Sequence, residues 1–248
     1  LAESGFDPLS RTTRFMLTEE AHHMFVGETG VGRVIQRACE MMKEDPNEDV
    51  RAQGGVDLPT IQKYLNFWFS SSVDLFGGEI SSNAADYFAA GLKGRDKEEK
   101  YEDHLALDGT YTMDVIDSGK LDTKSVPMRN AMNEILRDAY IADNQKAVDR
   151  WNKTVRKQGI DFTFSLPNRR FNRKVGLYSG LHFDPDGNPI TDVQFNERRF
   201  DWLPSDEDGA YLRRIQQAVF ERGKIANWIA PPARGINGQE FDFEYVKV

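Results

Sequence analysis

The sequence predicts a mainly α protein, with a helical bundle over residues 1–160 and an irregular cap packed on it over residues 161–248. Through most of the first part, apolar residues recur every three to four positions, which is the period of a helix that buries one face. After residue 160, prolines and turn-forming dipeptides become dense and this period is lost. A chain of 248 residues with 39% hydrophobic content can form one sizeable core.

Three long helices are expected in the first part. A stripe of apolar and small side chains predicts the first over residues 10–42, with that stripe buried along its length. The second opens at Leu58, with a proline in its first turn, and continues to about residues 91–94. The third begins after residues 125–127 and ends at Gly159, because a glycine commonly terminates a helix.

Shorter elements are expected between and after these helices. Residues 97–107 form a short, heavily charged helical segment, and residues 108–124 have the pattern of an irregular segment or a hairpin. In the cap, residues 206–223 indicate one more helix. Residues 193–195 and 241–246 are short extended segments that we expect to pair with neighbours.

Composition excludes several classes of protein and of site. The formal net charge of −8 argues against free nucleic acid as a partner. Cys39 is the only cysteine, which excludes a disulfide within the chain and a site built from several cysteines, and fits a cytoplasmic location. No apolar run approaches the ~20 residues that cross a bilayer, so we expect no membrane partner.

The most informative motif is the run TEEAHH at residues 18–23. Residues three apart lie on one face of a helix, so each Glu-x-x-His pair aims an oxygen and a nitrogen at one point. Helix bundles that hold two irons build each half of their site in this way. Glu20 and His23 share their face with the longer apolar stripe, so we favour them as metal ligands, with His22 as a neighbour. The alternative is an exposed acid beside a surface histidine.

Two further acidic positions are candidate ligands. Asp74 lies among small and aromatic side chains, where an ionised carboxylate needs a cation or hydrogen-bond donors. Either a metal or, alternatively, nearby serines or a basic residue could satisfy it. Asp103 and His104 lie in a run of acids, where a ligand role competes with that of a solvated charged face.

A basic cluster in the cap is the remaining candidate site. Arg169, Arg170, Arg173 and Lys174 form the densest group of positive charge and could hold a phosphorylated or nucleotide-bearing ligand. The alternative is a solvated loop. The glycines of residues 27–32 do not make a phosphate-binding loop, because they lack the Gly-Lys-Ser/Thr ending and lie in a helical pattern.

Several runs of the chain resemble the oxygenase component of benzoyl-CoA 2,3-epoxidases, and together they extend from the first helix into the cap. A more distant similarity links residues 19–23 to the Asp-Glu-Ala-x-His motif of phenylacetyl-CoA epoxidase subunits. The resembling runs are FMLTEEAHHMFVGETGVGR (15–33), SSNAADYFAAGLKGR (81–95), LRDAY (136–140), RWNK (150–153) and GLYSG (176–180).

This resemblance implies a ferritin-like, non-haem di-iron fold and a monooxygenase activity. Two iron ions would be reduced with NADPH electrons delivered by a separate flavin/iron–sulfur reductase. One atom of O2 would then enter the ring of benzoyl-CoA to give the 2,3-epoxide, in aerobic benzoate degradation. A ferritin-like iron-binding protein without oxygenase activity is the alternative, and a purely structural bundle with a hydrogen-bonded Glu20–His23 pair is a third possibility.

Carried onto this chain, the resemblance implies specific metal ligands, and the residues themselves suggest two hypotheses about substrate contacts. Glu20, His23 and Asp74 would bind iron, together with Asp103 and His104, although the Glu-x-x-His order is not kept at the last two. The small residues Ser71 and Gly78, beside Asp74, would leave room for the aromatic acyl group. The CoA phosphates would contact Arg169 and Arg170, with Arg173 and Lys174.

One departure from the family concerns the start of the chain. Such bundles take one carboxylate from a helix about thirty residues before the Glu-x-x-His helix, whereas only nineteen residues precede Glu20 here. We therefore expect this chain to be a fragment in which the first bundle helix is missing. The apolar stripe of residues 10–42 would then lose a partner and expose a contiguous apolar surface.

Overall fold

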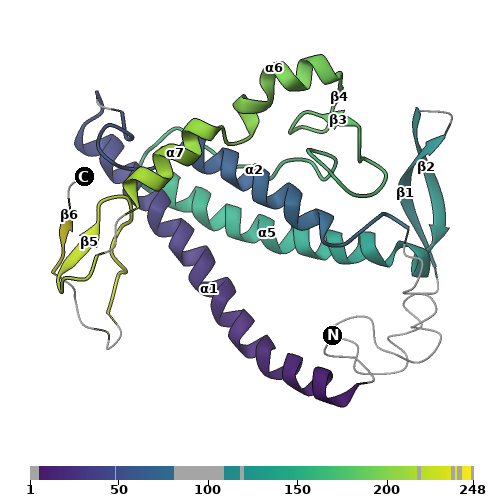
Figure 1. The fold of residues 1–248 in the computed structure, drawn as a ribbon, viewed down its shortest axis with the longest axis horizontal. Helices are drawn as coiled ribbons and strands as arrows, with labels where there is room; N and C mark the ends of the chain where they lie inside the picture. The colour runs from purple at the N-terminus through teal and green to yellow at the C-terminus, as the bar shows by residue number, and fades with distance from the viewer. Residues whose placement is uncertain are drawn as a thin grey trace.

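The computed structural model describes residues 6–47, 49–80, 109–117, 120–216, 219–235, 238 and 242–246. Three long helices dominate this part of the chain: α1 (Asp7–Glu44), α2 (Leu58–Asp74) and α5 (Met132–Lys157), as Figure 1 shows. The sheets of the described residues are small, with two strands each. The predicted mainly α fold, consistent with a ferritin-like class, is therefore confirmed. Across the described residues, no helix is both long and apolar enough to cross a membrane.

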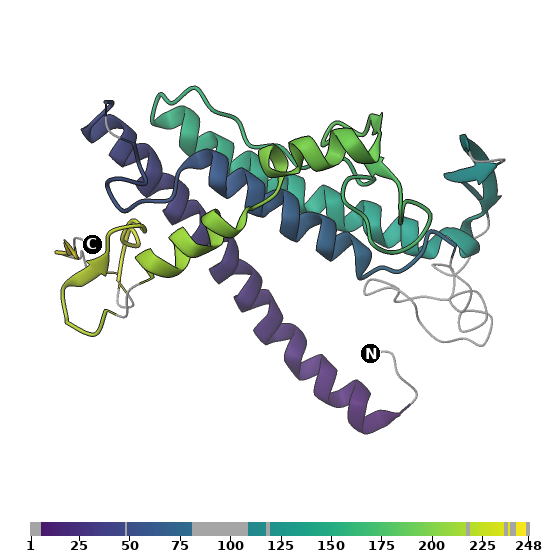
Figure 2. The ribbon, with the colours of Figure 1, turned by 45° about the horizontal axis from the view of Figure 1, so that its top comes forward.

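The two halves of α1 have different surroundings. Its second half packs on α5 and α2, and from Glu28 onward it is tied to α5. Arg150 pairs with the Glu28 carboxylate, and the Trp151 indole N–H donates to the Glu28 carbonyl over 3.1 Å. The first half extends away from the other helices, as Figure 2 shows.

Burial along α1 follows this division. The predicted burial of the whole stripe is wrong for the first half, where Met16 is 50% exposed and the side chains of Glu20 and His23 are more than half exposed. The expected exposed apolar surface is confirmed at the same place. The second half supplies the core, because its apolar side chains meet those of α2, α5 and the cap. The core includes Ile35, Ala38, Cys39 and Met41 from α1, Leu58 and Ile61 from α2, Val148 and Val155 from α5, and Phe164, Tyr211 and Ile215 from the cap.

Helix α2 begins as predicted and ends earlier. The Asp57 side chain accepts from the Thr60 amide, which caps the first turn. The expected continuation to residues 91–94 is wrong, because the helix stops at Asp74. Gly77 has a φ of +81° and donates its amide to the Asp74 carbonyl, a conformation that glycine adopts more readily than other residues. The charged segment expected at 97–107 lies outside the described residues.

The hairpin and the third helix follow the sequence pattern. Strands β1 (Thr110–Asp117) and β2 (Lys120–Pro127) pair in antiparallel register, with Asp117 opposite Lys120. A short 3₁₀ helix, η1 (Met128–Ala131), leads into α5. Gly159, with a φ of +72°, follows the end of α5.

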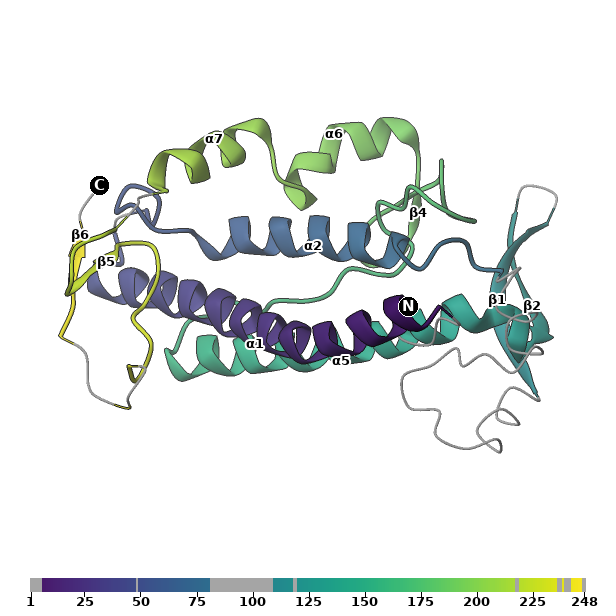
Figure 3. The same ribbon diagram turned by 60° about the horizontal axis from the view of Figure 1, so that its bottom comes forward.

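The described part of the cap contains two helices where the sequence predicts one. Helix α7 (Asp206–Ile215) begins at the expected residue and ends sooner. Residues 193–195, expected to be extended, lie instead in α6 (Asp192–Trp202). The reason is a capping box, in which the Thr191 and Gln194 side chains each bond the other's backbone amide. Figure 3 shows α6 and α7 running along α2 on the side away from α5.

The cap strands are short. Strand β3 (His182–Phe183) pairs with β4 (Pro189–Ile190), and β5 (Lys224–Ala226) pairs in parallel with β6 (Glu244–Val246). The expected extended segment is thus confirmed at residues 244–246, and its partner is residues 224–226, not 193–195. The cap shares its apolar core with α1, α2 and α5, and the domain boundary near residue 160 stays a prediction.

Candidate functional site

Glu20 and His23 form a pair on the projecting half of α1. The Glu20 Oε2 and His23 Nδ1 atoms lie 3.5 Å apart, as one face of a helix requires. Their side chains are 56% and 63% exposed, respectively. His22 lies beside them, with its ring centroid 6.5 Å from that of His23. The pair is therefore open to solvent and is not enclosed by the core.

The donor atoms of this pair fit half of an iron site. One carboxylate oxygen and one imidazole nitrogen are the ligands that each half of a di-iron bundle takes from such a helix. Within the described part of the chain, Glu20 makes no ion pair with a lysine or arginine that would compete with a metal. The same part of the chain brings together no group of three or more His, Cys, Asp or Glu residues that could hold a metal. Any further ligands must therefore come from outside the described residues.

The sequence leaves open whether a metal or a neighbouring side chain balances the charge of Asp74. In the structure, a basic residue does so. Its Oδ1 accepts from the Arg173 Nε, and its Oδ2 accepts from the Lys174 amide over 2.8 Å. Ser71 does not contact the carboxylate, since its hydroxyl donates to the Phe67 carbonyl. A metal would have to displace Arg173 before it could bind Asp74. The structure does not bring Asp74 together with Glu20 and His23.

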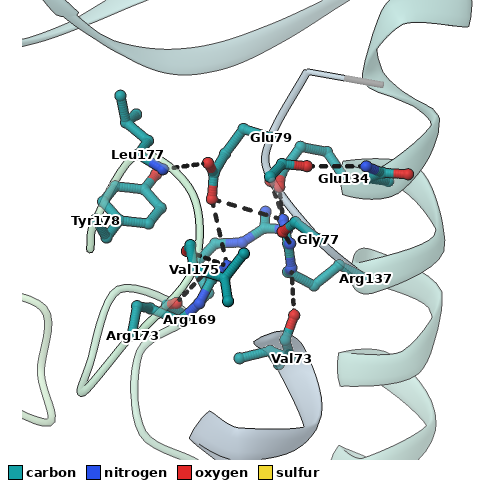
Figure 4. A network of polar contacts seen from close by, with 12 residues as sticks. Val73, Gly77, Glu79, Glu134, Arg137, Arg169, Arg173, Val175, Leu177 and Tyr178 are labelled. Carbon is teal, nitrogen blue, oxygen red and sulfur yellow. Dashed lines mark hydrogen bonds and ion pairs between the residues drawn. The ribbon is translucent and has the colours of Figure 1, made fainter. Parts of the chain in front are cut away.

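Arg173 also belongs to a buried network, which Figure 4 shows with Glu79, Arg137 and Glu134. Its side chain has no exposed surface, and its Nη2 lies 3.4 Å from Glu79 Oε1. Glu79 Oε2 also accepts from the Leu177 amide. Asp74 and Glu79, from the end of α2 and the turn after it, thus hold the cap segment 173–177.

A second buried arginine connects α5 to the same turn. The guanidinium of Arg137 donates to the carbonyls of Val73 and Gly77 over 3.1 and 2.7 Å. It also pairs with Glu134, one turn earlier on α5. Burial, with the nearby positive charge of Arg173, lowers the pKa of Arg137 to about 10, which leaves it charged near neutral pH. The network therefore joins α2, α5 and the cap.

Sequence reasoning missed Glu79, Glu134 and Arg137 in this network. The signal for the last two was present, because opposite charges three residues apart on a helix are close enough to pair. They sit among the apolar positions that predicted the buried face of α5. Glu79 carries no local signal, since its partner Arg173 is far away in the sequence.

The arginines of the basic cluster are neutralised within the protein. Arg169 pairs with Glu134 at 2.8 Å and with Asp138 at 2.7 Å. Arg170 pairs with Asp114 of β1, which also accepts from the Tyr178 hydroxyl over 2.7 Å. Burial and the Asp114 charge raise the pKa of that tyrosine. The alternative of a solvated loop is wrong for these two arginines, because their ion pairs connect the cap to α5 and to the β1–β2 hairpin.

Arg169 and Arg170 also line a polar cavity of about 200 Å³. Asp114 and Glu134 line the same cavity, so a phosphate there would meet as many carboxylates as guanidinium groups. Lys174 contrasts with the arginines, because its side chain is exposed. The assignment of the CoA phosphates to this cluster stays a prediction.

Gly78 and Ser71 are the two small residues that were expected to leave room for a substrate beside Asp74. The Gly78 carbonyl accepts from the Asn133 side chain over 2.9 Å. A Cβ atom added to Gly78 would lie 3.8 Å from the Gly176 Cα, so this glycine faces the cap segment. Their predicted role beside an aromatic acyl group stays a prediction. Asp103 and His104 lie outside the described residues.

Comparison with known proteins provides independent information. The chain matches no model of a known protein family. It is 51% identical over 251 residues to a protein of Aromatoleum evansii named benzoyl-CoA oxygenase component B. The match covers 100% of this chain and 53% of that protein, so the chain spans about half the length of the curated relative. The resemblance predicted from the sequence is thus confirmed, because this chain is similar over its entire length to benzoyl-CoA oxygenase component B.

Proposed function

We propose that this chain is part of the oxygenase component of a benzoyl-CoA oxygenase, a di-iron monooxygenase that converts benzoyl-CoA to its 2,3-epoxide. The observation that carries the proposal is the 51% identity over the whole chain to a protein of that name. The name of the relative, component B, supports an assembly of several components. A reductase component that delivers electrons from NADPH is the partner that we propose.

Glu20 and His23 are the residues that we propose as one half of the metal site. The Glu20 Oε2 and His23 Nδ1 atoms lie 3.5 Å apart on one exposed face of α1. Among the described residues, no lysine or arginine forms an ion pair with Glu20 that would compete with a metal. Iron held there would supply the redox chemistry needed to activate O2 for insertion into an aromatic ring. The contribution of this chain is to present one carboxylate and one imidazole in a fixed relation. The remaining ligands would come from outside the described residues.

The two registers of residues 18–23 offer a matched test. We expect the double substitution Glu20→Gln with His23→Asn, made in the full-length protein, to lower bound iron and to abolish benzoyl-CoA-dependent O2 consumption. The control is Glu19→Gln with His22→Asn, which changes the same residue types one position earlier and should keep both properties. Elemental analysis measures the iron, and an oxygen electrode measures the consumption.

The same measurements separate the alternatives. Equal iron content in the two double variants would contradict the assignment of Glu20 and His23. Iron without thioester-dependent O2 consumption in the unaltered protein would favour a ferritin-like iron-binding protein. Absence of iron from the unaltered protein, with no change on iron addition, would favour a purely structural pair.

A further inference from the structure

Helix α1 is weakened at the point where it leaves the core. Residues 7–26 project from the other helices, as Figure 2 shows, and the rest of the helix is tied to α5 from Glu28 onward. Gly27 and Gly30 lie on either side of Glu28. Residues 27–30 therefore connect the projecting half of α1 to its packed half, and we call them the junction.

Packing does not account for the two glycines. Beyond its own helical turn, neither Gly27 nor Gly30 has an atom of the described residues within 4 Å of the place where a Cβ would lie. Alanine would therefore fit at both positions. Inside a helix, glycine is about fivefold less favourable than alanine, because it loses more backbone freedom on folding. Among the described residues, the two glycines thus weaken the helix without a gain in packing.

Side chains also compete for the backbone hydrogen bonds of this segment. The Thr29 hydroxyl donates to the carbonyl of Phe25 over 2.7 Å and to that of Val26 over 3.3 Å. The Trp151 indole N–H donates to the Glu28 carbonyl over 3.1 Å. In a helix, these three carbonyls accept from the amides of the residues four positions later. Competition of this kind loosens and bends helices, so it weakens the junction independently of the glycines.

The packed half of α1 lacks this freedom. A Cβ atom at Gly32 would lie 3.5 Å from the Trp151 Cδ1 atom, so this glycine faces α5. Ile35 has no exposed surface, and Ala38 is 1% exposed. Opening of the helix after residue 32 would expose this core, whereas opening at the junction breaks mainly backbone hydrogen bonds. The helix therefore opens more readily at the junction than in its packed half.

We propose that the junction is a hinge, about which residues 7–26 change direction while the core keeps its fold. Glu20 and His23 lie on the moving side, so the hinge would set how they approach the remaining ligands of a metal. Only this last consequence rests on the proposed function. The hinge itself requires no metal and is tested on the metal-free chain, so either proposal can fail alone.

Distances between two spin labels measure the motion. Cys39 is fully buried, and burial raises the pKa of its thiol to about 11, so labels attach only to introduced cysteines. Labels at Arg14→Cys and Lys146→Cys connect the projecting half to α5, and labels at Lys43→Cys and Lys146→Cys connect the packed half to α5. All three positions are exposed. Double electron–electron resonance should give a broad distance distribution for the first pair and a narrow one for the second.

Alanine substitutions locate the hinge. Gly27→Ala with Gly30→Ala should narrow the first distribution and slow amide exchange at the junction about 25-fold, which is about fivefold for each glycine. Gly32→Ala is the matched control, because it makes the same change two residues after Gly30, in the packed half. It should alter neither measurement, since residue 32 stays helical while the junction opens. The second label pair should respond to none of these changes.

Thr29→Ala tests the competition for hydrogen bonds separately. It removes the hydroxyl and should narrow the first distribution in part. Equal widths for the two label pairs in the unaltered chain would overturn the proposal, because α1 would then be rigid throughout. So would a first distribution that the alanines at residues 27 and 30 leave unchanged, or one that Gly32→Ala narrows to the same extent.

Discussion

Asp74 compensates the charge of an arginine that has no exposed surface. It accepts one hydrogen bond from the Arg173 side chain and one from the Lys174 amide, so both of its oxygens serve the cap. A buried guanidinium is tolerated only where carboxylates and carbonyls surround it. Asp74 and Glu79 provide the carboxylates, and the carbonyls of Arg169 and Val175 accept from the remaining nitrogens.

We expect Asp74→Asn to destabilise the protein and to leave its iron content unchanged. The substitution keeps the shape of the side chain and removes the charge, so about 1.5–3 kcal/mol of unfolding free energy should be lost. Urea unfolding measures the loss, and elemental analysis measures the iron. Asp201→Asn is the control, since Asp201 is 63% exposed and should change stability little. Loss of iron with unchanged stability would instead support the ligand role that the sequence suggests.

The residue scale also shows where prediction from sequence stops. The Glu20–His23 contact could be predicted, because two residues three apart on a helix are neighbours whatever the rest of the fold does. The partner of Asp74 could only be offered as a basic residue of unknown position, since Arg173 is brought to it by the tertiary fold. Pattern reasoning finds contacts within an element and leaves open those between distant elements.

Helix α7 is held at its first turn by a carboxylate with two functions. Asp208 accepts from the Ser205 amide in a capping box and pairs with Arg51 from the segment between α1 and α2. Burial alone would raise the pKa of Asp208, but the hydrogen bonds from Arg51 and Ser205 and the positive charges of Lys63 and Arg51 together outweigh it and lower the pKa to about 2.

This pKa predicts an acid-dependent contribution to stability. Because the pKa is lower in the folded state, Asp208 stabilises the fold above about pH 4, and the contribution is lost as the pH falls towards 2. The difference in unfolding free energy between the unaltered protein and Asp208→Asn should be about 2 kcal/mol at pH 6 and should shrink below pH 4. A difference that stays constant between pH 6 and pH 2.5 would contradict this prediction.

At the scale of elements, interactions between residues close in the sequence explain which helix ends could be predicted and which could not. The starts of α2 and α7 could be read from the sequence, because Asp57 and Ser205 cap them directly. The capping box at Thr191 was equally local and marks α6, yet the apolar residues 193–195 looked like a strand. The early end of α2 depends on Gly77, whose positive φ is one of several conformations that glycine can adopt.

At the scale of the whole molecule, the first half of α1 is notable for its exposed apolar side chains. On the first half of α1, Phe15, Met24 and Phe25 are 76%, 71% and 65% exposed. Exposed apolar side chains concentrated on one projecting helix segment tend to mark an interface. The apolar stripe predicted on this helix includes Met16 and none of these three residues. A period of 3.6 also cannot say whether a neighbour covers a helix face.

We expect this surface to control association of the 248-residue chain without contributing to its stability. Phe15→Ser with Phe25→Ser should reduce self-association in sedimentation velocity and leave the unfolding free energy nearly unchanged. Ile35→Ser, on the buried half of the same helix, should instead destabilise the chain by several kcal/mol, about the cost of an unpaired polar group in place of core packing. Comparable destabilisation by both changes would show that the first half of α1 is part of the core.

The anchoring of α1 from Glu28 onward has a consequence for how the protein would respond to loss of metal. Residues 7–27 of α1 project beyond the contact of Glu28 with α5, and the Glu20–His23 pair lies on this projecting segment. A metal bound by this pair and by ligands from outside residues 7–27 would connect the projecting segment to another part of the protein. Removal of the proposed metal by a chelator should therefore free the projecting segment while the core stays folded. Amide hydrogen exchange should accelerate for the residues that precede Glu28 and change little for those that follow Val31.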